Sequence, residues 1–140
     1  MKSEKKNVVL DTNITISAAI NIGGAPAQIL RLLVVGKIIN HTTEDIIEEV
    51  KGVFEKFHIK KAVTEKDKDF LIKGFIDRST IIIPKFNEKV IIEDPSDDKF
   101  INCALTSKSN IISGDSHLLR LKNYKEVKIM SAKEFLESLK

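Results

Sequence analysis

A short run of strand-forming residues, Val8-Val9-Leu10, stops abruptly at the polar sequence Asp11-Thr12-Asn13. This pattern is typical of a buried strand that runs out into a loop. A similar pattern lies far downstream, in Ile111-Ile112-Ser113-Gly114-Asp115. If both strands belong to one parallel sheet, Asp11 and Asp115 emerge together at its carboxyl edge, where open α/β sheets bind their ligands.

Strand-like and helix-like segments alternate along the whole chain. Apolar residues spaced three and four apart indicate helices, and short β-branched runs indicate strands. Helices are expected over residues 14–20, 26–35, 43–57, 64–76, from about 96 through 105, over 116–121, and after a capping box at 131–134. Strands are expected over residues 8–10, 38–41, 80–83, 110–113 and 127–130. The alternation predicts an α/β fold, a three-layer α/β/α sandwich with a mainly parallel central sheet.

Some segments carry more specific expectations. Thr80-Ile81-Ile82-Ile83 is a continuous apolar run, of the kind found in strands that are covered on both faces. Residues 85–93 are expected to form a loop, in which Val90-Ile91-Ile92 is a candidate extended piece. Thr42 or Thr43 is expected to cap the helix over 43–57, and Thr64 the helix that follows.

The length and composition suit one globular domain. A chain of 140 residues can bury roughly two-thirds of its unfolded surface, so we expect a single domain over residues 1–140, with residues 1–6 as a flexible tail. Hydrophobic residues make up 42% and charged residues 31%, which argues against disorder. The net charge of +3 is compatible with nucleic-acid binding but is explained as simply by a lysine-rich surface.

The expected compartment is the cytoplasm. Cys103 is the only cysteine, which excludes an internal disulfide or a thiolate metal cluster and suits a small buried core residue. No apolar run approaches the roughly 20 residues that a membrane span needs. The first six residues also lack the apolar segment of a signal peptide.

Helix geometry separates the acids that face inward from those that face solvent. On the helix expected over 43–57, the apolar residues from Ile46 to Phe57 define the buried face. Glu48 lies roughly 170° from its centre, whereas Glu49 lies only about 90° away, on its rim. Glu49 can therefore turn toward an interior cleft, which Glu44, Glu48 and Glu55 cannot easily do.

A second inward-facing acid heads the helix that begins near Ser96. Asp97 is aligned with the apolar stripe formed by Phe100, Ile101, Ala104 and Leu105, while Asp98 lies about 100° round and Asp94 precedes the helix. A carboxylate in such a position needs a partner, because burying an unpaired charge is costly. Simple capping of the helix explains Asp97 equally well, and the choice between Asp97 and Asp98 depends on where the helix starts.

Each of these acids has an ordinary structural explanation, since an Asp after a strand often makes a turn or starts a helix. Their conjunction is more informative. Four carboxylates brought together cannot all stay ionised without cations, because like charges raise one another's pKa values. Hard oxygen ligands with room for water favour Mg²⁺ or Mn²⁺.

The sequence resembles the PIN-domain family of nucleases, and in particular the prokaryotic branch of toxins from toxin–antitoxin pairs (the VapC-like branch). The resemblance runs from about Val8 to Leu121. Its motifs are residues 8–13, 43–50, 94–104 and 111–115, in the family's order and spacing. It implies the fold expected above and a metal-dependent ribonuclease that cleaves single-stranded RNA, with Mg²⁺ or Mn²⁺ as the cofactor.

Carried over residue by residue, the family's acidic quartet falls on Asp11, Glu49, Asp97 and Asp115. The resemblance assigns metal binding to the three aspartates, and Glu49 completes the shell or orients the attacking water. Asn13 and Ser113 match polar positions that steady the site by hydrogen bonds. It also implies a small antitoxin partner and a homodimer, for which the apolar residues of 14–22 and 26–35 offer surface.

Candidates for gripping RNA are cationic residues, since phosphate neutralisation supplies most non-specific affinity. They are Arg31, Lys85, Lys89, Arg120 and Lys122, each explained more simply as a surface charge. His117 follows the last acid by two residues and is a candidate phosphate contact or a packing residue. With no Trp and one Tyr, Tyr124, base stacking has little support.

Two other readings remain open. A receiver-like signalling domain also places acids around Mg²⁺ at strand ends, but it leaves a helical Glu49 without a role. A non-catalytic RNA-binding scaffold would use the same fold without the chemistry.

Overall fold

The first strand establishes the two faces of the central sheet. The computed structural model describes residues 5–140, apart from the side chains of Phe57 and His58. Strand β1 (Lys6–Leu10) is buried from Val8 onward. Because successive side chains point to opposite faces, Val9 joins one apolar cluster and its neighbours Val8 and Leu10 join the other.

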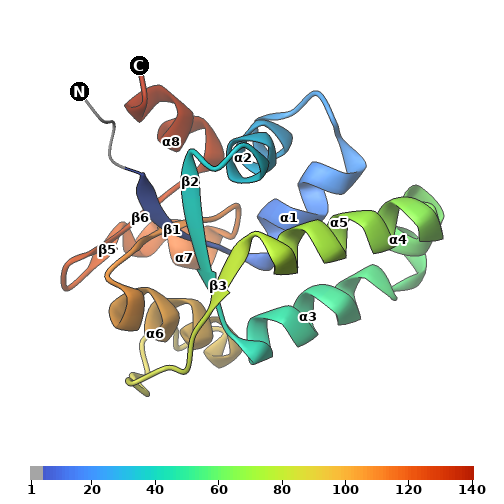
Figure 1. Ribbon diagram of the computed structural model, residues 1–140. Coiled ribbons are helices and arrows are strands. Elements are labelled where there is room, and N and C mark those ends of the chain that lie inside the picture. Colours follow the sequence, from blue (N-terminus) through green and yellow to red (C-terminus); the bar gives the residue numbers. More distant parts are fainter. Residues whose placement is uncertain (1–4) are drawn as a thin grey trace.

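Six strands form the sheet, in the order β3-β2-β1-β4-β6-β5 (Figure 1). The others are β2 (Ile38–Thr42), β3 (Ser79–Ile81), β4 (Asn110–Ile112), β5 (Asn123–Tyr124) and β6 (Val127–Met130). Only β5 runs antiparallel to its neighbour. Strand β1 lies at the centre, parallel to both β2 and β4. The predicted mainly parallel sheet is therefore confirmed.

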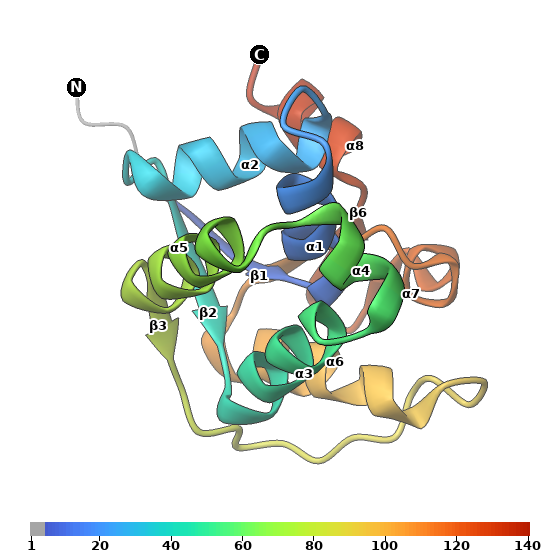
Figure 2. The same cartoon turned by 90° about the vertical axis from the view of Figure 1, so that its right-hand side faces the viewer.

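Helices cover both faces of this sheet (Figures 1 and 2). On one face, α2 (Ala25–Val34) and α8 (Ala132–Ser138) pack in the cluster that contains Val8 and Leu10. On the other, α3 (Glu44–Phe54), α6 (Asp98–Ser107) and α7 (Ser116–Leu121) pack in the cluster that contains Val9. Helix α1 (Thr12–Ile20) contributes to both clusters. This is the three-layer sandwich that the alternation predicts.

Two further helices extend the second layer beyond the sheet. Helix α4 (Phe57–Ala62) connects α3 to α5 (Glu65–Asp77), and α3 and α5 lie side by side (Figure 2). Ile59 and Phe75 bury their side chains in the same cluster as Val9. These helices therefore belong to the main core.

A buried asparagine holds the end of β1 in place. The backbone N–H of Leu10 donates to Oδ1 of Asn40 at 2.9 Å, and Nδ2 of Asn40 donates to Oγ of Ser79 at 2.8 Å. Asn40 is fully buried, so its bonds replace those that water would make. They link β1, β2 and β3 one residue before Asp11.

The capping predictions are confirmed at three helices. Oγ1 of Thr43, not of Thr42, accepts from the N–H of Ile46, and Thr64 accepts from the N–H of Asp67. Ser131 and Glu134 form a complete capping box at the start of α8. Each bond satisfies an amide that the first helical turn leaves unpaired.

One helix prediction and one strand prediction are wrong. The helix expected over 43–57 ends at Phe54 and is followed by a turn and a separate α4; Phe57, expected on its buried face, has a side chain outside the described part. The apolar run 80–83 is not covered on both faces. Strand β3 ends at Ile81 and stands at the edge of the sheet, where Ile81 is 49% exposed; Ile83, beyond the end of the strand, is 86% exposed.

The segment around residue 90 is not a strand. The N–H groups of Val90 and Ile91 donate to Oδ1 of Asp98 at 3.0 and 2.7 Å. A side chain thus takes the place of a strand partner, which hydrophobic pattern alone does not reveal. The short β5 was not predicted, because two residues are too few to leave a pattern.

Three smaller expectations concern the ends of the chain, Cys103 and membrane segments. Lys6 of β1 pairs with Ile38 of β2, so the flexible tail expected over residues 1–6 does not extend to Lys6. Residues 1–4 lie outside the described residues. Cys103 is free and buried, as predicted. Within residues 5–140, no single helix has the length and apolar content of a membrane span. Taken together, α1 and α2 do have that length and apolar content, but they are bent by 102° at the break between them.

The core packing predicts a sharp contrast between two isoleucines. Ile101 is fully buried on α6, whereas Ile92 is 89% exposed. Replacing Ile101 with Ala should lower the free energy of unfolding by about 2–5 kcal/mol, because the cavity cannot collapse fully. The matched control Ile92→Ala should change it by no more than about 0.5 kcal/mol. Urea unfolding of both variants measures the difference; equal stabilities would contradict this account of the core.

Candidate functional site

Four acidic side chains that the sequence singles out line one pocket of about 300 Å³: Asp11, Glu49, Asp97 and Asp115. They come from four separate parts of the fold. Two follow the neighbouring strands β1 and β4, one lies on α3, and one ends a short 3-10 helix, η1 (Pro95–Asp97), just before α6. The predicted convergence at the carboxyl edge of the sheet is therefore present.

Asp11 and Asp115 are both helix caps as well as pocket residues. Asp11 is 2% exposed; its Oδ1 accepts from the N–H of Ile14 at 3.1 Å, and its Oδ2 accepts from the hydroxyl of Ser113. Oδ1 of Asp115 accepts from the N–H of His117 at 2.7 Å. The ordinary structural role and the pocket position thus coexist, because the helices begin where the strands end.

Ser113 connects the two strand-end acids. Its Oγ donates to Asp11 and accepts from the N–H of Asp115 at 2.9 Å. This is the bonding role expected of it. Asn13 also lines the pocket but is exposed, and its side chain has no hydrogen-bond partner within residues 5–140.

Both oxygens of the Glu49 carboxylate have partners. Oε2 accepts from the hydroxyl of Thr12, and Oε1 lies 2.7 Å from Nζ of Lys99. The same ammonium donates to the carbonyl of Ser96 at 2.6 Å and lies 5.2 Å from the ring centre of Phe100. Neither Thr12 nor Lys99 was predicted to belong to the site. Thr12 follows Asp11 directly and Lys99 follows Asp97 by two residues, but only the folded chain shows that they meet Glu49.

Asp97 and Asp98 have clearly different roles. Asp97 is only 7% exposed, and its side chain makes no capping bond to α6. Its Oδ2 is buried without a hydrogen-bond partner in the part of the chain that the structure describes. Asp98 instead accepts from two backbone N–H groups of the preceding loop. Capping therefore does not explain Asp97. The choice of Asp97 over Asp98 as the pocket residue agrees with this geometry.

Burial and charge crowding alter the acidity of two pocket carboxyls. Burial raises the pKa of Asp97 to about 7, with further contributions from the negative charges of Asp115, Asp94 and Glu49 and an opposing one from Lys99. Burial also raises the pKa of Asp11 to about 6, against the opposing hydrogen bonds from Ser113 and Ile14. The pocket is thus short of positive charge.

Two residues outside the predicted quartet join it at one side. Ligand atoms of Asp94, Asp97 and His117 all lie within 4.8 Å of one another. Oδ1 of Asp94 also accepts from the hydroxyl of Ser96 at 2.6 Å. Their spacing was a possible signal, because Asp94 lies three residues before one pocket acid and His117 two after another.

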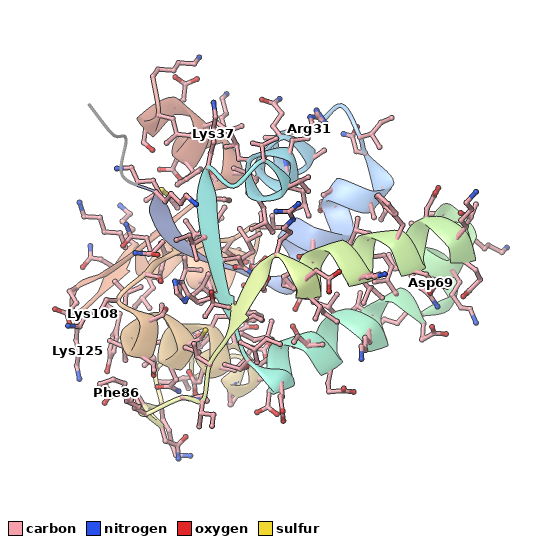
Figure 3. The ribbon with its side chains drawn as sticks, viewed as in Figure 1. Arg31, Lys37, Asp69, Phe86, Lys108 and Lys125 are labelled. Atoms are coloured by element: carbon pink, nitrogen blue, oxygen red, sulfur yellow. The ribbon has the colours of Figure 1, made fainter. Side chains whose placement is uncertain are left out.

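The predicted RNA-gripping residues do not line the acidic pocket: Arg31, Lys85, Lys89, Arg120 and Lys122. Arg31 lies on α2, on the upper side of the molecule in Figure 3, where its guanidinium donates to the carbonyl of Ile22. Lys89 lines a neighbouring cleft. Among the described residues, the cation that lines the pocket is Lys56, at the start of α4, which was not one of the predicted residues.

The residues present fit a divalent metal ion. The quartet offers carboxylate oxygens, which are the donors that Mg²⁺ and Mn²⁺ prefer. The buried Oδ2 of Asp97 lacks a partner among the described residues, and such an atom is costly unless it bonds something. A cation there would satisfy this oxygen and relieve the crowding of negative charge.

Comparison with known proteins assigns the family. A sequence profile described as PIN domain matches residues 7–117 of the chain. The chain belongs to the PIN-domain family. PIN domains are generally nucleases, and an acidic cluster able to hold a metal ion is present in this one. The resemblance noted from the sequence motifs is confirmed.

One relative of this PIN domain is an uncharacterized protein, MJ1680, from Methanocaldococcus jannaschii. It is 36% identical over 146 residues, which cover 98% of this chain and 94% of that protein. Two solved structures share the fold. PAE2754 from Pyrobaculum aerophilum has a TM-score of 0.65 and 13% identity, over 96% of this chain and 89% of that chain. VapBC2 from Rickettsia felis, bound to a DNA fragment from its promoter, has a TM-score of 0.58 and 17% identity, over 88% of this chain and 96% of that chain.

The raised pKa values predict an unusual pH dependence in this PIN domain without metal. Between about pH 4 and 7, the folded protein holds protons on Asp97 and Asp11 that the unfolded chain has released. The free energy of unfolding should therefore fall as pH rises, by at most about 1.4 kcal/mol per pH unit for each carboxyl. Asp97→Asn should become more stable relative to wild type over this range.

Urea unfolding in EDTA from pH 4.5 to 7.5 measures this difference. Comparing the two proteins at each pH cancels carboxyls with lowered pKa, such as Glu55 and Glu88. The control Glu48→Gln, which removes an exposed charge, should run parallel to wild type. A gap between wild type and Asp97→Asn that stays constant with pH would show that Asp97 titrates normally.

Proposed function

We propose that this chain is a metal-dependent endoribonuclease that cleaves single-stranded RNA and acts as the toxin of a toxin–antitoxin pair. The observation that carries the proposal is the meeting of Asp11, Glu49, Asp97 and Asp115 in one pocket. There, Oδ2 of Asp97 is buried and has no partner among the described residues. Membership of the PIN-domain family adds the expectation of nuclease activity.

The pocket residues have different roles in phosphodiester hydrolysis. Asp11, Asp97 and Asp115 hold one or two Mg²⁺ or Mn²⁺ ions, and Glu49 completes the set or orients the attacking water. A bound divalent ion supplies a more acidic water and stabilises the charge that grows on the phosphate. Ser113 and the N–H of Ile14 keep the carboxylate of Asp11 in a fixed orientation. Lys56 lies where it can meet the RNA backbone.

A larger cleft next to the pocket suits a single strand. Its volume is about 820 Å³, its lining includes Phe86, Lys89 and Lys99, and it shares Ser96 with the acidic pocket. Phe86, on the loop after β3 at the lower left of Figure 3, is 43% exposed, so its ring is available for stacking on a base. The cleft provides a route for the substrate that the sequence did not indicate.

Such an enzyme would act in the cytoplasm.

The two alternative functions are less well supported. The family assignment removes the receiver-like signalling domain, which belongs to a different family. A non-catalytic RNA-binding scaffold would have no need for the unpartnered Asp97 or for four carboxylates in a pocket that repels phosphate. Their presence favours the enzyme.

The proposal predicts a loss of cleavage in two variants of the pocket. Asp11→Asn and Glu49→Gln should each lower the Mn²⁺-dependent cleavage of single-stranded RNA by at least about 100-fold, the order of loss when one charge-stabilising group leaves an active site. Glu44→Gln, which removes an exposed charge on α3 outside both the acidic pocket and the larger cleft, should cleave normally. EDTA should abolish cleavage by the wild type.

Gel analysis of a labelled RNA, with circular dichroism to confirm folding, gives these rates. Undiminished cleavage by Asp11→Asn would refute the assignment of the pocket. Tight RNA binding without any cleavage by the wild type would favour the scaffold.

The toxin role rests on an apolar groove as well as on the family. The groove, of about 310 Å³ between α2 and α5, is lined by Leu30, Arg31, Leu33, Val34, Val35, Phe70, Leu71, Gly74 and Phe75. Phe70 is 83% and Val35 66% exposed, which is unusual for large apolar side chains. We assign this groove to an apolar segment of a small antitoxin protein. The homodimer expected from the family stays a prediction.

Growth of cells that express the chain tests the toxin role. Induction of the wild type should stop growth, induction of Asp11→Asn should not, and the product of an adjacent small gene should restore growth. Phe70→Asp should weaken that rescue while RNA cleavage in vitro is retained, because the groove shares no lining residue with the acidic pocket. The control Ile83→Asp changes an equally exposed side chain outside the groove. Unimpaired growth under the wild type would argue against a toxin.

A further inference from the structure

Three possible metal ligands gather at one side of the acidic pocket. Ligand atoms of Asp94, Asp97 and His117 lie within 4.8 Å of one another, although the residues come from the loop before η1, the end of η1 and α7. Only Asp97 belongs to the family's quartet. Asp94 and His117 therefore add donors for which the proposed nuclease reaction has no assigned use.

Among the described residues, Asp97 is the pocket carboxylate with a buried oxygen that has no hydrogen-bond partner. Asp11 accepts from Ser113 and Ile14, and Glu49 accepts from Thr12 and Lys99. Asp97 is 7% exposed, and its Oδ2 is buried without a hydrogen-bond partner in the described part of the chain. A buried oxygen in this condition is costly unless it bonds something, and Asp94 and His117 bring possible ligand atoms within 4.8 Å of a ligand atom of Asp97.

Lys99, which bonds a carboxylate of the quartet, does not bond Asp97. Nζ of Lys99 lies 2.7 Å from Glu49 and 2.6 Å from the carbonyl oxygen of Ser96, and its side chain is 18% exposed. Its charge therefore compensates Glu49 directly and Asp97 only from a distance. The group formed by Asp94, Asp97 and His117 keeps an excess of negative charge.

The imidazole decides which ion this group prefers. Carboxylates alone favour Mg²⁺ or Mn²⁺, whereas imidazole nitrogen favours Zn²⁺, Co²⁺ and similar ions. The side chain of His117 is 33% exposed, and its Nδ1 lies 3.8 Å from Oδ1 of Asp115.

We propose that Asp94, Asp97 and His117 form a subsite for a divalent transition metal ion of the Zn²⁺ and Co²⁺ class, with a preference different from that of the oxygen-only quartet. Asp97 belongs to both groups, so the subsite would adjoin the metal position of the proposed nuclease and rests on that proposal for its part in catalysis. Binding of the ion itself does not depend on RNA cleavage.

Calorimetric titration of the purified chain with Co²⁺ and, separately, with Mg²⁺ tests the subsite. His117→Gln and Asp94→Asn should each weaken Co²⁺ binding by at least about tenfold, since even residues that support a metal ligand are worth that much. Both variants should leave Mg²⁺ binding within about twofold. Glu93→Gln, which removes an exposed charge beside Asp94, and His41→Gln, which removes a histidine elsewhere, should change neither.

The proton spectrum of the Co²⁺ form gives a second measurement. A paramagnetically shifted imidazole resonance should be present in the wild type and in His41→Gln and absent in His117→Gln. Failure of the wild type to bind Co²⁺, or Co²⁺ binding unaffected by both His117→Gln and Asp94→Asn, would overturn the subsite. Neither result would touch the nuclease proposal, which fails instead if Mn²⁺ supports no cleavage.

Discussion

The pairing of β1 with β4 is the contact on which the site depends. Leu10 is opposite Ile112, and the N–H of Asp11 donates to the carbonyl of Ile112 at 3.1 Å. Because both strands end at this level, Asp11 and Ser113 lie within hydrogen-bond reach although they are far apart in the sequence. A shift of one residue in register would turn these side chains to the other face of the sheet. The hydrogen bond from the N–H of Leu10 to Asn40 holds the end of β1 in place and so opposes such a shift.

Charge balance is the second constraint on this pocket. Several carboxylates share a small volume, and each has a different compensation. Asp11 accepts hydrogen bonds from a backbone N–H and from the hydroxyl of Ser113. Glu49 contacts the ammonium of Lys99 and accepts from a hydroxyl. Asp115 accepts from a backbone N–H of α7. Asp97 has the least, and burial together with the neighbouring negative charges raises its pKa to about 7, above the value of about 6 at Asp11. A fold that leaves one carboxylate undercompensated is prepared to bind a cation there.

Much of the fold and the four acids could be predicted, because the relevant signals are local. Strand ends, helix faces and capping residues depend on neighbours a few positions away, and they located Asp11, Glu49, Asp97 and Asp115. The predictions failed where distant segments decide. The apolar run at 80–83 forms an edge strand because no further strand pairs with β3, and residues 90–91 bond to Asp98 instead of a strand. The cations predicted to bind RNA were identified by their charge alone, and charge does not indicate where a side chain lies in the fold.

The sequence by itself determined the alternation of strands and helices and which acids face inward, since both follow from the periodicity of backbone geometry. It also determined the family, through motifs in a fixed order. Only the tertiary structure decided that Thr12 and Lys99 complete the bonding of Glu49, that Asp94 and His117 approach Asp97, and that α2 and α5 enclose an apolar groove. These contacts join side chains from separate segments, and their distances exist only once the core has packed.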